Sequence, residues 1–228
     1  MSDAKSPLLH WQPVPTPASV TLRGRTVTLE PLDAARHTAD LWLALRGHDA
    51  VWTWMFDGAY ASEEELRGAV EQKQAAASMV YFALLPGATG RAEGWASLMR
   101  PDPAHGVVEV GNIVLAPSLQ RTTAATEAMY LLARHVFETL GYRRYEWKCN
   151  ALNQPSRRAA ERLGFRFEGI FRQHMVVKDR SRDTAWFSML DGEWPERKRA
   201  FEAWLEPANF NEVGGQIRGL AQIAALQS

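Results

Sequence analysis

Apolar and polar positions along the first half of the chain switch between the period of a strand and the period of a helix. In chain order, the pattern predicts a strand, two helices and three further strands, over 25–32, 34–46, 63–77, 79–85, 94–100 and 107–115. Asp33 is placed to cap the first helix. Turns at 86–90 and 101–106 join the last three strands, which should therefore form successive hairpins.

The second half of the chain continues this alternation. A long helix should follow residue 120, because apolar residues recur at helical spacing until Gly141 ends it, at Ala125, Met129, Leu132, Val136, Phe137 and Leu140. A strand over 142–149 precedes a short helix over 156–163, with Asn153 as its N-cap and Gly164 as its stop. The remaining expected elements are a strand pair over 165–177 and 184–190 joined by a charged turn at 179–182, a helix over 193–205, and a weak apolar segment over 214–226 whose docking is left open.

Together these elements predict one globular domain with two flanking segments. The chain has 228 residues, 46% of them hydrophobic, so it can bury a core without metals or disulfides. Residues 1–19 hold several prolines and no periodicity, which is typical of an arm. We expect the domain over 20–205 and a C-terminal extension over 206–228.

Charge and cysteine content narrow the class of protein. The 26 Lys and Arg residues balance 26 Asp and Glu, so no overall field directs the chain to nucleic acid or to a membrane surface. We find no secretory leader pattern and no apolar run of membrane-spanning length. The single cysteine, Cys149, excludes an internal disulfide framework and is expected to be a small buried residue rather than a nucleophile. We expect a cytoplasmic monomer or homodimer without a metal site.

The turn at 120–126 is a candidate anion site. It follows an apolar strand and opens the long helix, where free backbone N–H groups and the positive end of the helix dipole favour negative charge. Thr122, Thr123 and Thr126 add hydroxyl donors. Every helix has such a start, so a phosphate-bearing ligand is indicated only in combination with further motifs.

The order of elements around this turn resembles the acyl-CoA-binding core of the GNAT N-acetyltransferases. The family's pyrophosphate turn carries Gln or Arg, two residues, Gly, one residue, and then Gly or Ala; here these positions hold Gln120, Thr123 and Ala125. The family's second motif is matched by Asn153, Ser156, Leu163, Gly164 and Phe165, and continues with Phe167, Glu168 and Gly169. The resemblance covers about residues 20–194 and is nearest to the branch related to ribosomal-protein N-terminal acetyltransferases.

This resemblance implies a mixed α/β fold, with a mostly antiparallel sheet flanked by helices, and acetyl-CoA as co-substrate. The implied coenzyme contacts are Ile113, Val114 and Leu115 along the pantetheine arm, Gln120, Arg121, Thr122, Thr123, Ala124, Ala125 and Thr126 at the pyrophosphate, and Asn153 and Ser156 nearby. One position departs from the family pattern, because Thr123 stands where Gly is usual and its side chain crowds the approach of the pyrophosphate. We expect binding to be retained with the help of threonine hydroxyls; loss of binding is the alternative.

Acetyl transfer to an amine requires a polarised carbonyl, a deprotonated amine and close positioning. By resemblance, a backbone N–H of Val114 or Leu115 acts as the oxyanion donor. Many family members carry a Tyr acid where this chain has Ala160, whereas the ribosomal-protein branch relies on the position of Ser156. Since a serine hydroxyl is a poor acid, we expect Ser156 to hydrogen-bond the sulfur; its alternative role is to satisfy the helix backbone.

The general base remains open among several groups. Relatives in this branch carry a Glu on the strand after the Gly-Phe motif, where this chain has Met175. Glu109, on the strand that leads to Ile113, is the leading replacement. A water chain to solvent is another route for the proton.

Two further polar residues are candidate acceptor contacts. Glu146 lies on a strand with polar alternation, which indicates a wet groove because unpaired buried charge is costly; the alternative is simple pairing with Arg144 or Lys148. His174 belongs to the residue type that titrates near neutral pH, although it could be a structural hydrogen bonder. Arg182 and Asp183 are interpreted as a turn ion pair without a catalytic part.

The connection between the first two helices is a candidate wall of the acceptor pocket. It concentrates the large side chains Trp52, Trp54, Met55, Phe56 and Tyr60. Ligand sites favour aromatic linings, and we assign Trp52 and Trp54 to the acceptor. We expect core packing to account for at least half of the cluster.

We therefore predict an N-acetyltransferase that moves an acetyl group from acetyl-CoA to a primary amine by direct attack in a ternary complex. The acceptor is a peptide, such as a protein N-terminus, or a small-molecule amine, and the residues do not choose between them. The alternative function is a module that binds acyl-CoA without turnover, which Thr123, Ala160 and Met175 favour. A donor longer than acetyl is a third possibility.

Overall fold

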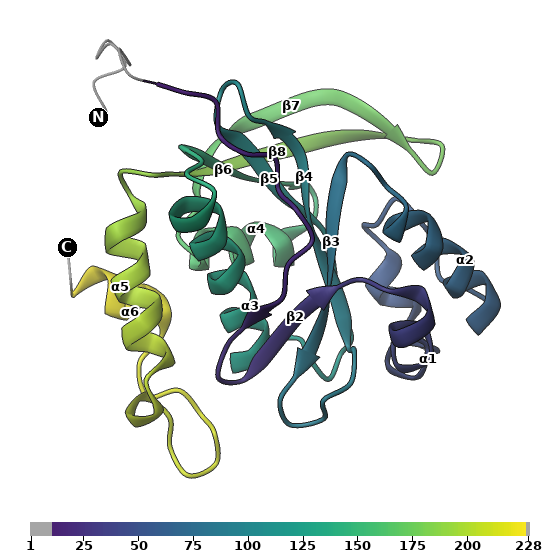
Figure 1. The fold of residues 1–228 in the computed structure, drawn as a ribbon, viewed down its shortest axis with the longest axis horizontal. Coiled ribbons are helices and arrows are strands. Elements are labelled where there is room, and N and C mark those ends of the chain that lie inside the picture. The colour runs from purple at the N-terminus through teal and green to yellow at the C-terminus, as the bar shows by residue number, and fades with distance from the viewer. Residues whose placement is uncertain (1–10, 227–228) are drawn as a thin grey trace.

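A computed structural model describes residues 11–226 as one sheet with helices on both faces (Figure 1). The strands are β1 Leu22–Arg23, β2 Val27–Pro31, β3 Met79–Pro86, β4 Gly94–Asp102, β5 Val107–Leu115, β6 Arg144–Asn150, β7 Arg166–Val177 and β8 Arg180–Leu190. The helices are α1 Ala34–Leu45, α2 Glu63–Gln74, α3 Thr123–Arg134, α4 Gln154–Arg162, α5 Trp194–Leu205 and α6 Leu220–Ala225, with shorter turns η1 Asp49–Trp52, η2 His135–Thr139 and η3 Pro207–Asn209. The eight-stranded sheet has the order β1-β2-β3-β4-β5-β6-β8-β7, and within it only β5 and β6 run parallel.

The predicted α/β architecture is confirmed, and local signals explain most element boundaries. Asp33 caps α1 by accepting a hydrogen bond from the Arg36 N–H at 2.9 Å. Gly141 and Gly164 have φ of 74° and 95°, the left-handed conformation that ends a helix and that glycine adopts without strain. Helix α3 extends into the π-helical turn η2, so the apolar spacing holds to the expected stop.

The last hairpin differs from expectation. Its turn consists of Lys178 and Asp179, with φ of 51° and 60°, and β8 begins at Arg180. A two-residue turn with positive φ at both positions matches the twist of its strands. The charged turn predicted over 179–182 is therefore wrong, because Arg180, Ser181 and Arg182 belong to β8 and pair with β7. The two-residue strand β1 was also not expected.

Two hydrophobic cores lie on opposite faces of the sheet. Alternate residues of a strand point to opposite faces, so Phe82 joins one core and Tyr81 the other. The larger core packs α3, α4, α5 and α6 against the sheet, and the smaller core packs α1, α2 and η1 against it. The sheet is consequently buried on both faces around β3, β4 and β5.

Helix α3 is anchored to the first strands by a buried carboxylate. The Glu127 side chain accepts hydrogen bonds from the backbone N–H groups of Arg25 and Thr26 at 2.9 and 2.6 Å. A Cβ at Gly24 would lie 2.6 Å from the Glu127 carboxyl carbon, so a close approach requires glycine there. This contact fixes the helix whose first turn forms part of the site described below.

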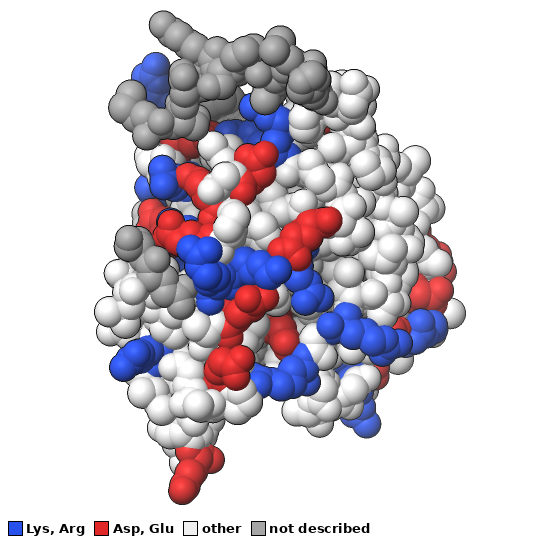
Figure 2. Space-filling model, turned by 60° about the vertical axis from the view of Figure 1, so that its left-hand side comes forward, with Lys and Arg blue, Asp and Glu red and all other residues white. Residues whose placement is uncertain are grey.

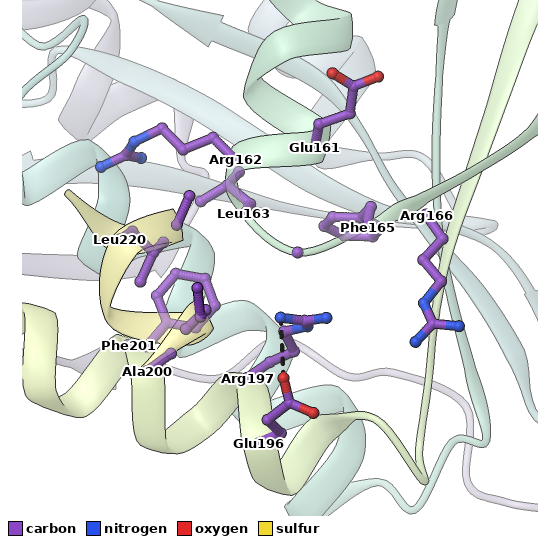
Figure 3. A pocket seen from close by; sticks show the side chains of 14 residues that line it. Glu161, Arg162, Leu163, Phe165, Arg166, Glu196, Arg197, Ala200, Phe201 and Leu220 are labelled. Carbon is purple, nitrogen blue, oxygen red and sulfur yellow. Dashed lines mark ion pairs between the residues drawn. The ribbon is translucent and has the colours of Figure 1, made fainter. Parts of the chain in front are cut away.

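Both flanking segments contact the domain. Within the predicted arm, Trp11 Nε1 donates to the Ala104 carbonyl at 2.8 Å; residues 1–10 of that arm lie outside the described residues. Toward the C-terminus, Leu220 and Ile223 of α6 are buried in the larger core, which answers where the apolar segment docks. Helices α5 and α6 border a hollow beside the end of α4, in which Arg197 pairs with Glu196 (Figure 3).

Acidic and basic side chains intermingle on the face of the molecule shown in Figure 2, rather than forming a field of one sign. Among residues 11–226, no helix combines the length and the apolar character that crossing a membrane requires. The same residues contain no group of three or more His, Cys, Asp or Glu side chains that could hold a metal ion.

Candidate active site

A cleft opens in the sheet where β5 and β6 part. Their parallel pairing ends at Val110 and Trp147, while β5 continues to Leu115 and β6 to Asn150. The edge of β5 that faces β6 is therefore unpaired beyond Val110. Its backbone donors and acceptors remain available to an extended ligand, since each strand residue carries one of each.

A bulge in β5 accompanies this divergence. Between the β4 pairs Trp95–Val114 and Ser97–Gly111 the register shifts, so β5 contributes one extra residue. Asn112 lies in the bulge with φ of 49°, a conformation that Asn adopts more readily than most residues. Bulges bend a strand, and this one directs the end of β5 away from β6.

The turn before α3 is prepared for an anion. Thr122 is the N-cap, because its Oγ1 accepts from the Ala125 N–H at 3.1 Å. Gln120 Nε2 donates to the Leu115 carbonyl at 2.9 Å and so ties the turn to the end of β5. Thr123 and Ala124 follow in the first helical turn, where backbone N–H groups have no partner within the helix. The turn that the sequence predicts to bind an anion therefore forms a corner with free backbone N–H groups, and anion binding there stays a prediction.

The threonine hydroxyls of this corner are not equivalent. The Thr122 hydroxyl donates to the Leu119 carbonyl at 2.7 Å as well as capping the helix. Thr126 Oγ1 donates to the Thr122 carbonyl at 3.3 Å and accepts from Arg162 at 3.2 Å. All three threonines line the adjacent cavity, and the hydroxyl of the half-buried Thr123 is the one of the three without a hydrogen-bond partner among the described residues.

Two adjoining cavities occupy the cleft. The phosphate-side cavity, of about 830 Å³, is bordered by the 122–126 corner and by Arg158 and Arg162 of α4. The acceptor-side cavity, of about 580 Å³, is bordered by the ends of β5 and β6 and by the loop after η1. They share wall residues, namely Ile113, Leu115, Arg121, Trp147, Pro155, Arg158 and Ala159. The two cavities therefore form one groove that runs from the helix start to the loop.

A tryptophan orients the Ser156 hydroxyl in this groove. Trp147 Nε1 donates to Ser156 Oγ at 3.0 Å, so the hydroxyl keeps its own proton for another acceptor. Asn153 caps α4 as predicted, with Oδ1 accepting from the Ser156 N–H at 3.2 Å. Burial raises the pKa of the neighbouring Cys149 thiol, which keeps it protonated, and the expectation of a buried cysteine is confirmed.

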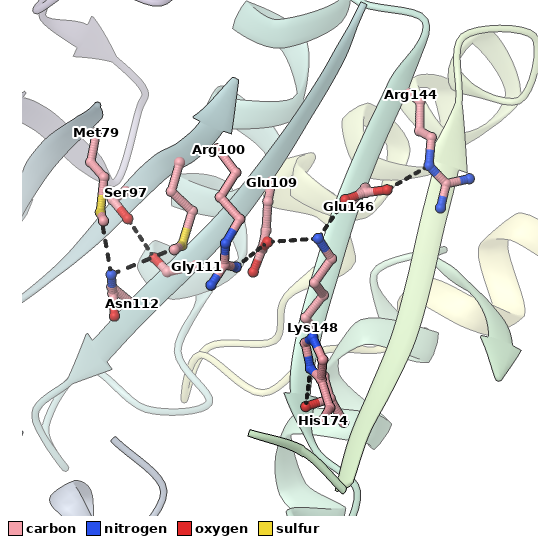
Figure 4. A network of polar contacts seen from close by, with 12 residues as sticks. Met79, Ser97, Arg100, Glu109, Gly111, Asn112, Arg144, Glu146, Lys148 and His174 are labelled. Carbon is pink, nitrogen blue, oxygen red and sulfur yellow. Dashed lines mark hydrogen bonds and ion pairs between the residues drawn. The ribbon is translucent and has the colours of Figure 1, made fainter. Parts of the chain in front are cut away.

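A chain of alternating charges crosses β4, β5 and β6 beside the groove (Figure 4). Glu109 is 3% exposed, and its Oε2 receives Arg100 at 2.6 Å and Lys148 Nζ at 3.0 Å. Because both cations contact Oε2, the second oxygen is left outside these ion pairs. Oε1 lies next to Gly111, where a Cβ would be only 3.3 Å away, and Gly111 lines the acceptor-side cavity. Glu109 itself lines neither cavity, and its Oε1 is separated from the acceptor-side cavity by Gly111.

The two other polar candidates lie outside the groove walls. Glu146 binds Lys148 Nζ at 2.7 Å through Oε2 and Arg144 Nε at 2.7 Å through Oε1, which is the simple pairing considered from the sequence. His174 is exposed on β7, with Nδ1 3.0 Å from Thr184 Oγ1. Neither residue borders either cavity.

The large side chains of the connection between α1 and α2 fall into two groups, one packed in the core and one lining the cavity. Trp52 is 4% exposed and packs in the smaller core against Tyr60 and Trp95, with ring centroids 5.0 and 5.8 Å away. It does not border the cavity, so its assignment to the acceptor lacks a contact. Trp54, Met55 and Phe56 line the acceptor-side cavity instead.

Arg182 is the functional candidate that the sequence did not reveal. It does not pair with Asp183, whose Oδ1 accepts from the Gln173 N–H at 2.7 Å, so the predicted turn ion pair is wrong. Arg182 lies on β8, is 7% exposed and lines the acceptor-side cavity. Its guanidinium carbon is 5.0 Å from the Phe56 ring centroid. A charged run at a hairpin carries no signal of such burial, which arises where β8 pairs with β7 and faces the loop that carries Phe56.

Comparison with known proteins agrees with this arrangement. Residues 26–166 match the family model of the acetyltransferase (GNAT) domain. The structure of a GCN5-related N-acetyltransferase from Brucella melitensis is 47% identical, with a TM-score of 0.94 over 96% of this chain and 100% of that chain. A probable GNAT-family acetyltransferase from Chromobacterium violaceum is 38% identical, with a TM-score of 0.79 over 86% of this chain and 98% of that chain.

A more distant solved structure shares the fold. It is a Salmonella typhimurium acetyltransferase that modifies the N-terminal serine of a 50S ribosomal subunit protein. It is 20% identical, with a TM-score of 0.64 over 75% of this chain and 99% of that chain. No curated protein matches the chain.

Proposed function

The chain belongs to the GNAT acetyltransferase family, and on that basis we propose that it transfers an acetyl group from acetyl-CoA to a primary amine within a ternary complex. The acceptor is a small-molecule amine or a protein N-terminus, the latter by analogy with the distant Salmonella enzyme. The observation that carries the proposal is the groove between β5 and β6, which leads from an amide-rich helix start to the acceptor-side cavity.

The donors along the groove suit the coenzyme. The N–H groups of Thr123 and Ala124 would receive the diphosphate, and Arg158 and Arg162 supply positive charge beside it. The unpaired edge of β5 from Ile113 to Leu115 would pair with the amides of the pantetheine arm. Each class of donor thus meets a coenzyme segment of matching chemistry.

When bound, acetyl-CoA supplies an activated thioester, whose carbonyl carbon the amine attacks as the carbon–sulfur bond breaks. A backbone N–H of Val114 or Leu115 would donate to the carbonyl oxygen and stabilise its growing negative charge. Ser156 would donate its proton in a hydrogen bond to the sulfur. Its acceptance of the Trp147 N–H polarises the hydroxyl and strengthens that donation.

Ser156→Ala should lower kcat about 10-fold and leave KM for acetyl-CoA nearly unchanged, because the lost hydrogen bond strengthens as charge develops on sulfur. Trp147 would lose its acceptor, so the free energy of unfolding should fall by about 1 kcal/mol. Steady-state kinetics and thermal denaturation measure both effects. Trp147→Phe is the control, since it keeps the hydroxyl and removes only its polarising donor, and kcat should fall less. An unaltered kcat in Ser156→Ala would assign the serine to helix packing alone.

We propose that Glu109 receives the amine proton, through Oε1 and a bridging water. Arg100 and Lys148 pair with Oε2, and Oε1 lies next to Gly111, which lines the acceptor-side cavity. Because a water would have to relay the proton to Oε1, the contribution of Glu109 should lie below the 10²-fold to 10⁴-fold that is typical of general bases.

Glu109→Gln should reduce kcat about 30-fold near neutral pH, and the deficit should shrink at high pH, where the amine loses its proton to solvent. Glu146→Gln is the matched control, because it also removes a carboxylate from Lys148, but both oxygens of Glu146 are held in ion pairs and neither is next to Gly111. Its kcat should stay within about 3-fold of the parent value. Rate–pH profiles of all three proteins provide the measurement. Equal losses in both variants would mean that the ion-pair network matters and that Glu109 is not the base.

The proposed function has a direct test. Calorimetry with acetyl-CoA, followed by thiol release against a panel of primary amines, separates an enzyme from a binding module. Binding with turnover supports the transferase, and binding without turnover on any amine supports the module. No heat from either acetyl-CoA or CoA would contradict both functions.

A further inference from the structure

The acceptor-side cavity is lined by positive charge. Its basic residues are Arg121, Lys148, Arg158 and Arg182, and among the described residues that line it there is no Asp, Glu or His. An amine acceptor is itself a cation before it reacts. A cationic pocket without a lining carboxylate therefore does not attract the amino group by charge. Its charge is instead complementary to a ligand that carries an anionic group.

Three of these four cations have a negative partner, either a carboxylate of the protein or the diphosphate of the proposed coenzyme. Arg121 and Arg158 also line the phosphate-side cavity, where the coenzyme diphosphate would neutralise them. Lys148 lies between Glu109 and Glu146, at 3.0 and 2.7 Å. Arg182 lines only the acceptor side and makes no ion pair with any carboxylate among residues 11–226. Its Nε is buried without a hydrogen-bond partner in the same set of residues.

A buried guanidinium without a directly paired carboxylate is costly. Arg182 is 7% exposed, and removing an ion from water carries a large penalty even after relaxation, of which the more distant charge of Glu109 offsets a part. Burial lowers the pKa of Arg182, yet a guanidinium does not lose its proton in proteins, so the charge persists. The contact with the Phe56 ring offsets a further part of this cost. A bound anion would offset the rest of the free-energy cost of burying the Arg182 charge.

We infer that Arg182 binds a carboxylate of the acceptor, so that the preferred substrate is an amine carrying a carboxylate close to its amino group. The inference rests on the proposed transferase function and names its substrate class. The planar guanidinium matches a carboxylate through two parallel hydrogen bonds. Trp54, Met55 and Phe56 form an apolar wall in the same cavity, which suits an amino acid with an apolar side chain.

The position of Arg182 separates this carboxylate from the coenzyme phosphates. Its ring contact is with Phe56 of the loop, and it does not border the cavity beside the 122–126 corner. The loop itself is held by the tip of the β7–β8 hairpin, where Lys178 Nζ donates to the Trp52 carbonyl at 3.0 Å. The hairpin therefore brings both the cation and the apolar wall to the acceptor end of the groove.

The test compares matched acceptors on matched variants. L-phenylalanine and L-methionine are paired with their amides, and the dipeptide amides Ser-Asp and Ser-Asn distinguish a side-chain carboxylate in a peptide from the carboxylate of a free amino acid. The kcat/KM for thiol release is measured for the parent protein, Arg182→Gln, Arg182→Lys and Arg180→Gln. Arg180 lies on the same strand but is exposed, so its variant controls for loss of a positive charge.

Arg182→Gln should lower kcat/KM about 10- to 100-fold for acceptors with a carboxylate, as expected for one charge-assisted contact. Their amide partners should change by less than about 3-fold, and the ratio between the two cancels the different reactivity of the amines. Arg182→Lys should retain part of the preference, and Arg180→Gln all of it. The Kd for acetyl-CoA should stay unchanged in every variant.

Equal losses for carboxylate and amide acceptors, or none, would overturn the inference and leave the transferase function intact. If no amine is turned over, the proposed function fails. The inference is then decided by calorimetry with N-acetyl-L-phenylalanine and its amide. Binding of the acid alone, lost in Arg182→Gln, supports a carboxylate site, and equal or absent binding refutes it.

Discussion

Gly94→Ala should lower the free energy of unfolding by about 3 kcal/mol and the melting temperature by about 6–12 °C. Gly94 is buried on β4, where a Cβ would lie 2.3 Å from the Val114 carbonyl oxygen and 3.2 Å from the Leu115 Cα. Both atoms belong to the backbone of a central strand, which cannot move without disturbing its pairing. The lower entropy of an unfolded chain with Ala would return only about 0.4–1 kcal/mol, so the clash dominates.

Gly68→Ala is the matched control for this substitution. Gly68 lies inside α2, and an added Cβ there would meet no atom within 4 Å. Since Ala favours a helix interior over Gly by about 0.8–1 kcal/mol, Gly68→Ala should stabilise the protein. Calorimetric melting of the two variants gives opposite signs if the contact with β5 is real. A melting temperature for Gly94→Ala at or above that of Gly68→Ala would contradict the packing of β4 on β5.

The steric clash expected in Gly94→Ala should also affect catalysis. Val114 and Leu115 form the strand end proposed to hold the pantetheine arm and to donate to the carbonyl oxygen. Any shift of that backbone would misplace the oxyanion donor, and small displacements of a positioned group cost large factors in rate. Assayed below its melting temperature, Gly94→Ala should therefore also show a lowered kcat/KM for acetyl-CoA.

The elements that the sequence predicted well are those specified by local chemistry. Asp33 and Asn153 act as helix caps because a side-chain oxygen reaches an N–H three residues ahead. Gly141 and Gly164 end helices because they adopt positive φ. The local structure of the 120–126 corner belongs to the same class, since a strand, a turn and a helix start are consecutive in the chain, and its role in binding a cofactor stays a prediction.

What the sequence did not reveal depends on contacts between distant segments. Arg182 becomes a buried cation only because β8 pairs with β7 and the hairpin lies against the loop that carries Phe56. The ion-pair partner of Glu109 on β4, Arg100, follows from the β4–β5 register, in which a bulge shifts the pairing between Met99 and Asp102. Polar alternation on β6 indicated buried charge but could not distinguish a wet groove from the closed network that forms.

Thr123→Asp should weaken acetyl-CoA binding at least 100-fold while leaving the free protein as stable as before or slightly more so. Helix α3 has no acidic residue in its first turn, so a carboxylate there would complement the dipole and add about 0.3–1 kcal/mol. The same charge would face the proposed diphosphate. Like unit charges about 4–6 Å apart repel by roughly 3–4 kcal/mol at the effective dielectric of a protein surface, and each 1.4 kcal/mol is about a factor of ten in Kd.

Thr123→Asp should have opposite effects on stability and on acetyl-CoA binding. It therefore tests whether the diphosphate binds at the first turn of α3, because a variant that merely damages α3 would lose both stability and binding. Thr123→Asn matches Asp in size without the charge, and its Kd should stay within about 5-fold of the parent value. Calorimetric titration with acetyl-CoA and thermal denaturation without it supply the two readouts. If Thr123→Asp binds as tightly as Thr123→Asn, the diphosphate does not rest on the first turn of α3, and the threonine that replaces the family's glycine has closed that site.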